Sequence, residues 1–301
     1  MVQVTILGVA QDGGRPHAGC TKPCCSTLNQ GDVFFPVSLG ILDDDNTSHL
    51  VEASRNLGEQ MRYLWKLEES NKASTRIDHV WLTHAHWGHV DGLGLFGRET
   101  MNARGVKLHV SKSMADLVER TPAWRIMVEQ GVFNVNIFHD TSSIGSVRVE
   151  VSPTLTVEAV PVPHRAELSD THAFLFRGPT KSLLFLPDHD TWGETLSMHD
   201  CSSITEWLHK LKVDIALFDG TFWSLDELGS RRSMKEVPHP PVSKTLAMLG
   251  NRSGCMDDNV PDVYFIHLNH TNPLFVEESV EYQRVIEMGW NVARQGQKFT
   301  L

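Results

Sequence analysis

The sequence lacks three features that would each mark a common class of protein: a long apolar run, an excess of basic residues and an N-terminal signal. Its apolar runs all fall short of the roughly 18 residues that a membrane-spanning helix needs, so no membrane association is expected. Lys and Arg total 27 against 37 for Asp and Glu, a net charge of −10, which argues against extended nucleic-acid binding. Residues 1–14 contain no basic segment, so a secretory signal is not expected either.

Cysteine is also scarce, and its distribution is uneven. There are five cysteines, and three of them crowd together at Cys20, Cys24 and Cys25. An odd number with this spacing argues against a secreted disulfide framework and for a reducing compartment, so a cytoplasmic location is expected. The cluster is then available to bind a metal, although a set of reduced structural thiols explains it as well. It lies in residues 10–33, which are too rich in Gly and Pro to form a regular element.

Histidine, by contrast, is abundant, with sixteen residues, and three of them follow one apolar run. Residues 80–82 (Val-Trp-Leu) have the composition of a buried strand, and His84, His86 and His89 come directly after it. Neutral imidazole is the commonest metal ligand, and two imidazoles at positions i and i+2 of an extended segment can face one point. The spacing therefore predicts a metal site at the end of a strand rather than three solvated loop histidines.

Further residues of the metal-binding type follow other predicted strands. His164 follows residues 160–163, Asp188 follows residues 183–187 and His267 follows residues 264–266, all apolar runs. Each of these residues alone would more often be an exposed loop residue than a ligand. Because several strand ends present such residues together, we expect them to converge, with the strands as scaffold and the loops as the accessible site.

The order of elements predicts an α/β fold. Strand and helix patterns alternate in two halves, each rich in strands first and helical afterwards, which predicts two sheets packed face to face with helices outside. There is no long linker or repeat, which favours a single domain over residues 1–301, with the Cys-rich loop at 10–33 and a long loop at 224–241. Residues 135–138, 147–151 and 155–162 are expected to form antiparallel strands, a helix is expected to begin near Gly92, and the last helix is expected over 276–288.

These motifs resemble the metallo-β-lactamase superfamily. Its hallmark is His-x-His-x-Asp-His, then a distant His, a metal-bridging Asp and a final His, and THAHWGH, His164, Asp188 and His267 follow in that order. The resemblance covers essentially the whole chain and implies a four-layer αββα sandwich. The sequence most resembles the protein B family of pyrroloquinoline quinone biosynthesis, and it is similar to phosphonate-pathway cyclic phosphodiesterases and tRNase Z. The similarity rests on LGVAQDGG near the start, LFDGTF from Leu217 and FIHLNHTNP from Phe265.

The resemblance implies one or two divalent ions in the active site. His84, His86 and His164 would hold one, His89 and His267 the second, and Asp188 would bridge both; zinc is expected, with manganese or iron as alternatives. Gly88 stands where the motif has its aspartate. The second site would therefore lack the motif's own carboxylate and keep His89, His267 and Asp188. In hydrolytic members the missing carboxylate also orients the nucleophilic water. Asp91 is near enough in sequence to compensate, although the spacing does not require it.

Two further sites are implied by the resemblance. The phosphodiesterase relatives hold a closed structural zinc with three N-terminal cysteines and a histidine, which places Cys20, Cys24, Cys25 and His270 there. Adjacent cysteines do not easily bind one ion in a relaxed loop, so a different fourth ligand stays open. Asp219 and His239 match an acidic residue and a histidine of tRNase Z, and such a pair could protonate a leaving oxygen. A turn aspartate and a loop histidine remain the alternative.

The function predicted from these residues is that of a metal-dependent hydrolase. It would use metal-activated water on a phosphodiester or related ester of a small-molecule substrate. An oxidative enzyme with non-haem iron, of the cofactor-biosynthesis type, is the main alternative, and a metal-binding protein without catalysis is the third. A homodimer is an arrangement that the sequence leaves open.

Overall fold

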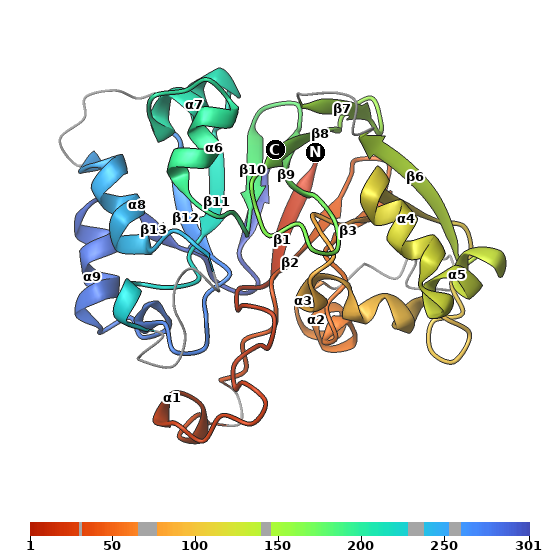
Figure 1. Cartoon of the computed structure of the whole chain (residues 1–301), viewed down its shortest axis with the longest axis horizontal. Coiled ribbons are helices and arrows are strands. Elements are labelled where there is room, and N and C mark those ends of the chain that lie inside the picture. The colour runs from red at the N-terminus through yellow and green to blue at the C-terminus, as the bar shows by residue number, and fades with distance from the viewer. Residues whose placement is uncertain (30–31, 66–76, 140–145, 228–237, 253–259) are drawn as a thin grey trace.

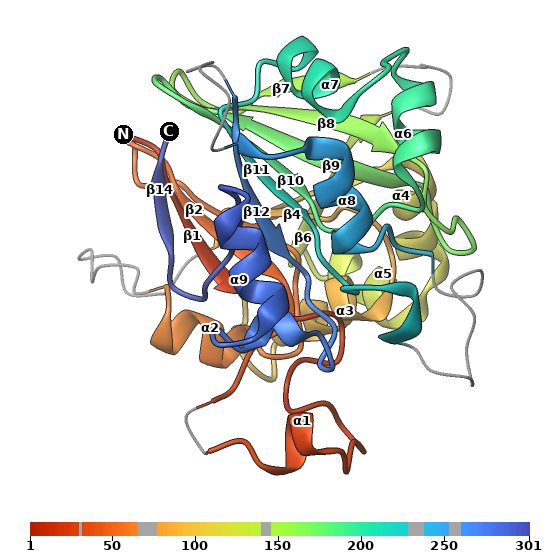
Figure 2. The ribbon, with the colours of Figure 1, turned by 90° about the vertical axis from the view of Figure 1, so that its left-hand side faces the viewer.

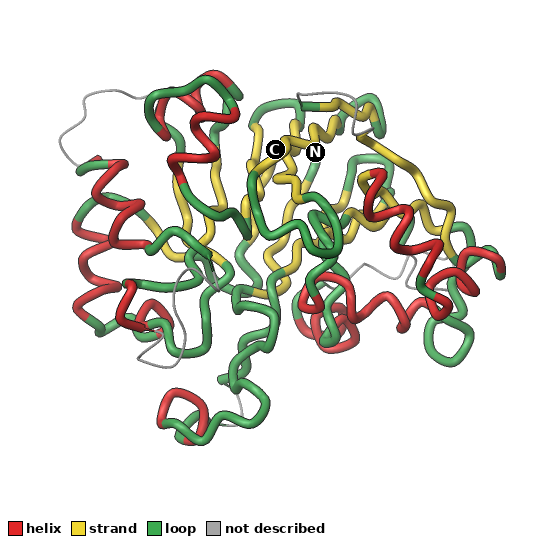
Figure 3. The backbone as a smooth tube through the Cα atoms, in the orientation of Figure 1, coloured by secondary structure: helices red, strands yellow, loops and turns green. Residues whose placement is uncertain are grey.

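Two sheets lie face to face at the centre of the molecule, and helices cover their outer sides (Figure 1). The computed structural model describes residues 1–29, 32–65, 77–139, 146–227, 238–252 and 260–301. The path of the backbone in Figure 3 shows the strands inside and the helices outside, so the predicted four-layer αββα sandwich is confirmed. Among the described residues, no helix is long and apolar enough to cross a membrane.

The first sheet is formed by the N-terminal half and by the last strand of the chain. Its order is β14 (Lys298–Thr300), β1 (Gln3–Gly8), β2 (Ser38–Leu42), β3 (Ser48–Val51), β4 (His79–Trp81), β5 (Val106–Ser111) and β6 (Phe133–His139). The pairs from β14 to β3 are antiparallel and those from β3 to β6 are parallel. The expectation that β6 is antiparallel to its neighbour was wrong, because the two helices between β5 and β6 return the chain to the same edge.

The second sheet is formed by the C-terminal half. Its order is β13 (Asn291–Val292), β12 (Asp262–Ile266), β11 (Ile215–Asp219), β10 (Ser182–Leu186), β9 (Thr171–Arg177), β8 (Thr156–Val162) and β7 (Val147–Glu150). The pairs from β7 to β10 are antiparallel and those from β10 to β13 are parallel. β9 and β10 form a hairpin, with Gly178 N donating to Lys181 O at 3.0 Å in its turn.

The helices differ from the predicted ones mainly at their ends. They are α1 (Pro23–Ser26), α2 (Leu57–Tyr63), α3 (Trp87–Val90), η1 (Asp91–Phe96), α4 (Lys112–Arg120), α5 (Pro122–Glu129), α6 (Trp192–Met198), α7 (Ile204–Lys210), α8 (Val242–Leu249), η4 (Pro273–Phe275) and α9 (Val280–Glu287). Ser111 caps α4, its side chain accepting from Met114 N. The helix expected near Gly92 begins already at Trp87. The last helix begins at Val280, because Ser279 caps it by accepting from Tyr282 N.

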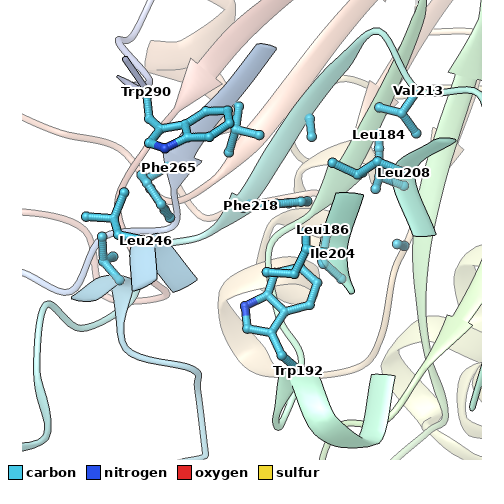
Figure 4. Close-up of a cluster of buried hydrophobic side chains, with 14 of the residues drawn as sticks. Leu184, Leu186, Trp192, Ile204, Leu208, Val213, Phe218, Leu246, Phe265 and Trp290 are labelled. Carbon is cyan, nitrogen blue, oxygen red and sulfur yellow. The ribbon is translucent and has the colours of Figure 1, made fainter. Parts of the chain in front are cut away.

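The alternation of side chains along β10 explains why this strand is apolar throughout. Leu183 and Phe185 point into the core between the two sheets, whereas Leu184 and Leu186 pack against the helices outside. A strand buried on both faces needs such a continuous apolar run. Figure 4 shows the outer core, where Trp192 lies beside Leu186 and Phe218. The packing fixes the carboxyl ends of the central strands, where the predicted site residues lie.

Candidate metal centre

The six residues predicted as active-site ligands meet at the carboxyl ends of the strands. His84, His86 and His89 follow β4, and His164, Asp188 and His267 follow β8, β10 and β12. The ligand atoms of His84, His86 and His164 lie within 4.8 Å of one another, and so do those of His84, His89 and Asp188. All six are buried except His86, whose side chain is 12% exposed. The fold thus joins residues from both sheets in one cluster.

Several atoms in this cluster have no hydrogen-bond partner within the described parts of the chain. They are His89 Nε2, His164 Nε2, His267 Nε2 and Asp188 Oδ2. Asp188 Oδ2 lies 3.2 Å from His89 Nε2 and 3.6 Å from His267 Nε2. Buried polar atoms are nearly always hydrogen-bonded, so a group of orphaned imidazole nitrogens around a carboxylate needs another partner. The set of nitrogen and oxygen donors fits a divalent metal ion.

The opposite nitrogen of each of four imidazoles is held in place by a polar side chain. His84 Nδ1 and Thr83 Oγ1 are hydrogen-bonded at 2.8 Å. His164 Nδ1 donates to Asp190 Oδ1 at 3.0 Å, and His267 Nδ1 donates to Thr221 Oγ1 at 2.8 Å. His89 Nδ1 faces Glu52 Oε2 at 3.4 Å. These partners are Thr83, Asp190, Thr221 and Glu52, and they turn Nε2 of each ring toward the cluster, as is typical of metal-binding histidines.

The protonation states of two of the proposed ligands, His84 and Asp188, suit metal binding as well. Burial, together with the neighbouring His89, holds the pKa of His84 well below its usual value, so this imidazole is neutral. Burial would raise the pKa of Asp188, but His267 and His89 outweigh it and hold that pKa well below its usual value. A neutral imidazole and an ionised carboxylate are the forms in which both side chains bind a metal.

Asp219 and His239 form the pair that was expected. His239 Nδ1 donates to Asp219 Oδ2 at 2.7 Å, and both side chains are buried. Burial lowers the pKa of His239, but Asp219 more than offsets this effect, so that the pKa is raised above its usual value. His239 Nδ1 also lies 3.6 Å from Asp188 Oδ1, so the pair adjoins the cluster of ligands.

A cavity of about 400 Å³ opens beside this pair. Its walls are formed by Asp190, Thr191, Leu225, Pro238, His239, Pro240, Pro241, Ser243 and Lys244. The lining comes from the loop after β10, from Leu225 after β11, and from the segment that leads into the first turn of α8. Part of the loop expected at 224–241 lies outside the described residues, which end at 227 and resume at 238.

Two carboxylates near His89 have positions that the sequence did not predict. Asp91, which we considered as a substitute for the missing motif aspartate, instead pairs with Arg55, with Nε and Oδ2 at 2.7 Å. Asp12, from the loop after β1, lies in the site: its Oδ1 is 3.4 Å from His89 Nε2 and 3.5 Å from His267 Nε2. Sequence reasoning missed Asp12, because it does not follow an apolar run directly.

The residues that orient the ligands were missed too. Glu52 directly follows β3 and is fully buried, and its backbone has a φ of 63°. Its Oε1 accepts from Thr83 N at 3.1 Å, so one carboxylate faces His89 and fixes the segment that leads to His84. The signal that could have found these residues is their place in the sequence: Thr83 precedes His84, Asp190 closely follows Asp188, and Glu52 directly follows β3.

The second predicted site also comes together. Sγ of Cys24 and of Cys25 lie 3.6 Å and 3.5 Å from His270 Nδ1, and Cys20 Sγ lies 3.9 Å from Cys24 Sγ. Both adjacent thiols face His270, because the short helix α1 turns them toward it. Within the described residues, Cys20, Cys24, Cys25 and Cys201 are free. Three thiols and an imidazole match the donor set of a closed zinc site.

Comparison with known proteins agrees with this geometry. The chain is 27% identical to coenzyme PQQ synthesis protein B of Methylobacterium sp. (strain 4-46) and 25% identical to that of Gluconobacter oxydans (strain 621H), over its whole length and at least 99% of theirs. Its fold is similar to that of Zn²⁺-bound PqqB from Methylobacterium extorquens, with a TM-score of 0.75, 22% identity and coverage of 99% of this chain and 100% of that one.

More distant structures share the fold as well. A diphosphatase of the PhnP family has a TM-score of 0.64 at 16% identity, covering 99% of this chain and 96% of its own. The short form of human tRNase Z has a TM-score of 0.57 at 14% identity, covering 99% and 98%. A family model described as the beta-lactamase superfamily domain matches residues 47–267, which include all six predicted active-site ligands. The predicted resemblance is therefore confirmed, and the chain belongs to the β-lactamase superfamily.

Proposed function

We propose that the protein is a metal-dependent hydrolase that cleaves a phosphodiester or a related ester with metal-activated water. One observation carries this proposal: the cluster of buried donors adjoins the hydrogen-bonded pair of His239 and Asp219, with His239 Nδ1 3.6 Å from Asp188 Oδ1. A site for a nucleophile and a proton donor thus lie side by side, as hydrolysis of an ester requires.

The proposed ligands fall into two groups that share one carboxylate. His84, His86 and His164 would hold one divalent ion, His89 and His267 would hold another, and Asp188 lies between both groups. Bound divalent ions lower the pKa of water and polarise a scissile group. Zinc is the ion that this donor set and the Zn²⁺-bound relative favour, with manganese or iron as alternatives.

Asp219 fixes the ring of His239 through Nδ1, which leaves the Nε2 edge to meet a ligand in the cavity that His239 lines. From there His239 would donate a proton to the leaving oxygen, a step worth about a hundredfold or more in rate. The cavity, at about 400 Å³, has the size of a small-molecule site, and the Lys244 ammonium in its wall suits an anionic ester. The free thiols of the cysteine cluster support a reducing compartment such as the cytoplasm.

An oxidative step in cofactor synthesis is the second candidate, and it has its own support. The relatives that match over the whole chain are named for the synthesis of coenzyme PQQ. Among the residues that the structure describes, the active-site donors are imidazoles and carboxylates without any thiolate, a set that suits iron or manganese as well as zinc.

The metal content of protein purified without added metal, together with two assays, tests these proposals. Zinc- or manganese-loaded protein should hydrolyse bis(p-nitrophenyl) phosphate, and His84→Ala/His86→Ala should lose both this activity and at least one ion per chain. Protein that carries iron and consumes oxygen with a reducing co-substrate, but leaves the ester intact, would favour the oxidative role. Full metal occupancy without either activity would leave a metal-binding protein without catalysis.

A further inference from the structure

We infer that Asp12 supplies the carboxylate that the superfamily motif would place at position 88, so that the second metal site is complete but takes this ligand from the N-terminal loop. The inference rests on the metal centre proposed above and not on hydrolysis.

The position of Asp12 is the first observation. Its Oδ1 lies 3.4 Å from His89 Nε2 and 3.5 Å from His267 Nε2. Asp188 Oδ2 faces the same two nitrogens at 3.2 Å and 3.6 Å. Both imidazoles are fully buried, and neither Nε2 atom has a hydrogen-bond partner among the described residues. Two carboxylates and two orphaned nitrogens therefore surround one point, which is a full set of protein ligands for a divalent ion.

The space around Gly88 is the second observation. A Cβ atom at Gly88 would lie 2.6 Å from Cβ of Asp12 and closer still to its Cα and Oδ1. These contacts involve the backbone of Asp12, so a rotation of its side chain cannot relieve them. Gly88 lies in α3 without a positive φ, so the backbone itself does not require glycine there. The position instead requires the absence of a side chain, although glycine inside a helix costs about 1 kcal/mol relative to alanine.

The backbone on either side holds Asp12 in this position. Gln11 N donates to Leu268 O and Leu268 N donates to Val9 O, both at 2.8 Å, so the loop is fastened directly beside His267. Ala10 N donates to Phe35 O at 3.0 Å on the other side. After Asp12 the chain turns through Gly14, whose φ is 68°, and runs on to α1, which projects from the body of the molecule (Figures 1 and 2). Because these hydrogen bonds already hold the backbone next to Asp12, its carboxylate loses little conformational entropy on binding an ion.

The position of Asp12 explains why the motif itself has no carboxylate at Gly88. Asp12 lies outside residues 47–267, which match the family model, so a pattern confined to that region shows only the loss at Gly88. The histidine loop has no carboxylate at position 88, and Asp12, from a different element, lies where a side chain at that position would be. Restoring the motif by Gly88→Asp would consequently not repair the site, because the new side chain would collide with Asp12.

Zinc binding to the full-length protein tests the exchange. Each variant is stripped with a chelator, reloaded with Zn²⁺ alone, and titrated against a chromogenic competitor, with elemental analysis for stoichiometry. Asp12→Asn, which keeps the shape but removes the charge, should weaken the binding of one ion by about tenfold or more. Asp12→Gly should do the same, and Gly88→Asp alone should also weaken binding. The double variant Asp12→Gly/Gly88→Asp should bind more tightly than either of its single variants.

Asp91→Asn is the matched control, because Asp91 is the other carboxylate near the histidine loop and is paired with Arg55. It should bind zinc as the wild type does. The inference is overturned if Asp12→Asn retains full affinity, if Gly88→Asp alone tightens binding, or if the double variant binds no better than Asp12→Gly. Should Gly88→Asp fail to fold, the comparison of Asp12→Asn with Asp91→Asn decides alone. Because the readout is metal binding, a failure of ester hydrolysis does not affect it.

Discussion

At the scale of single residues, Asp219 connects the two parts of the site. Its Oδ2 accepts from His239 Nδ1, and its Oδ1 accepts from Thr221 Oγ1 at 2.7 Å. Thr221 Oγ1 in turn accepts from His267 Nδ1. One buried carboxylate thus orients both the predicted proton donor and, through Thr221, a predicted metal ligand. Such shared partners couple the position of the ion to that of the acid.

The role of His239 gives the first prediction. His239→Asn should lower the rate of ester hydrolysis about a hundredfold, because the leaving oxygen loses its proton donor. The loss should be large for an alkyl ester and small for p-nitrophenol, which leaves readily without a proton. Hydrolysis rates for both esters, with zinc content as control, measure this. An equal loss for both leaving groups, or a loss of metal, would instead assign His239 to metal binding, as its distance of 3.6 Å from Asp188 would allow.

At the scale of elements, the N-terminal loop depends on contacts with the rest of the chain. Arg15 Nε donates to Cys24 O at 2.8 Å, and its guanidinium lies 4.6 Å from the ring of Phe275. His17 stacks on His270 at 4.4 Å. Few buried apolar side chains belong to residues 10–29 themselves, so a metal ion bound by the cysteine cluster would supply much of the stability of this loop.

Loss of a thiol gives the second prediction. Cys25→Ser should lower the melting temperature and remove one zinc ion per chain while the active-site ions stay bound. Burial and its two cysteine neighbours raise the pKa of Cys24 to about 11, so an ion is needed to hold this thiol as a thiolate. Thermal unfolding and elemental analysis measure the effect. Cys201→Ser is the control, because Cys201 lies outside the cluster. If both variants have the same melting temperature and zinc content, the cluster is a set of structural thiols and binds no metal.

Three neighbouring parallel strands carry a row of buried histidines that is part of neither the proposed metal centre nor the cysteine cluster. His49 on β3 pairs in register with His79 on β4, and His79 Nδ1 lies 2.9 Å from His109 Nε2 on β5. Trp81 stacks on His109 at 3.7 Å. Burial lowers the pKa of His49 and of His109 to about 3 and that of His79 to about 4, with Lys107 adding to the effect in each.

The third prediction is the acid sensitivity of this row. In the unfolded chain a histidine has a pKa of about 6.5, so below that pH the unfolded state binds protons that the folded state does not bind. The contribution of these histidines to the free energy of unfolding is therefore fully present above about pH 6.5. It decreases as the pH falls toward 3 to 4, by up to about 1.4 kcal/mol per pH unit for each histidine. Urea unfolding at several pH values should show a weaker decline for His49→Gln than for the wild type. His209→Gln, on the surface of α7, should not change the decline; an unchanged slope for His49→Gln would contradict the prediction.

At the scale of the whole molecule, the features that depend directly on apolar runs could be predicted from the sequence, and those that depend on distant parts of the chain could not. The strand ends near His84, His164, Asp188 and His267 were predicted correctly, because each of these residues lies shortly after a strand that the sheet must bury. Asp12 could not be predicted in this way, since only the backbone pairing of Val9 and Gln11 with Leu268 brings it to the site. The parallel direction of β6 was missed for a related reason, because strand direction depends on how helices pack and not on the strand itself.

The last prediction rests on the origin of the ligands in both sheets. His84 and His89 follow a strand of the first sheet, whereas Asp188 and His267 follow strands of the second, so bound ions would join the two sheets at one edge. Ions present at a hundred times their dissociation constant stabilise the folded state by about 2.7 kcal/mol for each site. Removing them should therefore increase hydrogen exchange at the loops of both sheets, in residues 83–90, 187–191 and 267–272. Hydrogen-exchange mass spectrometry before and after chelation measures this. Cys25→Ser is the control, because it should affect residues 10–29 and 268–272 and leave 83–90 and 187–191 protected. An increase confined to residues 83–90 would show that the second sheet contributes no ligand.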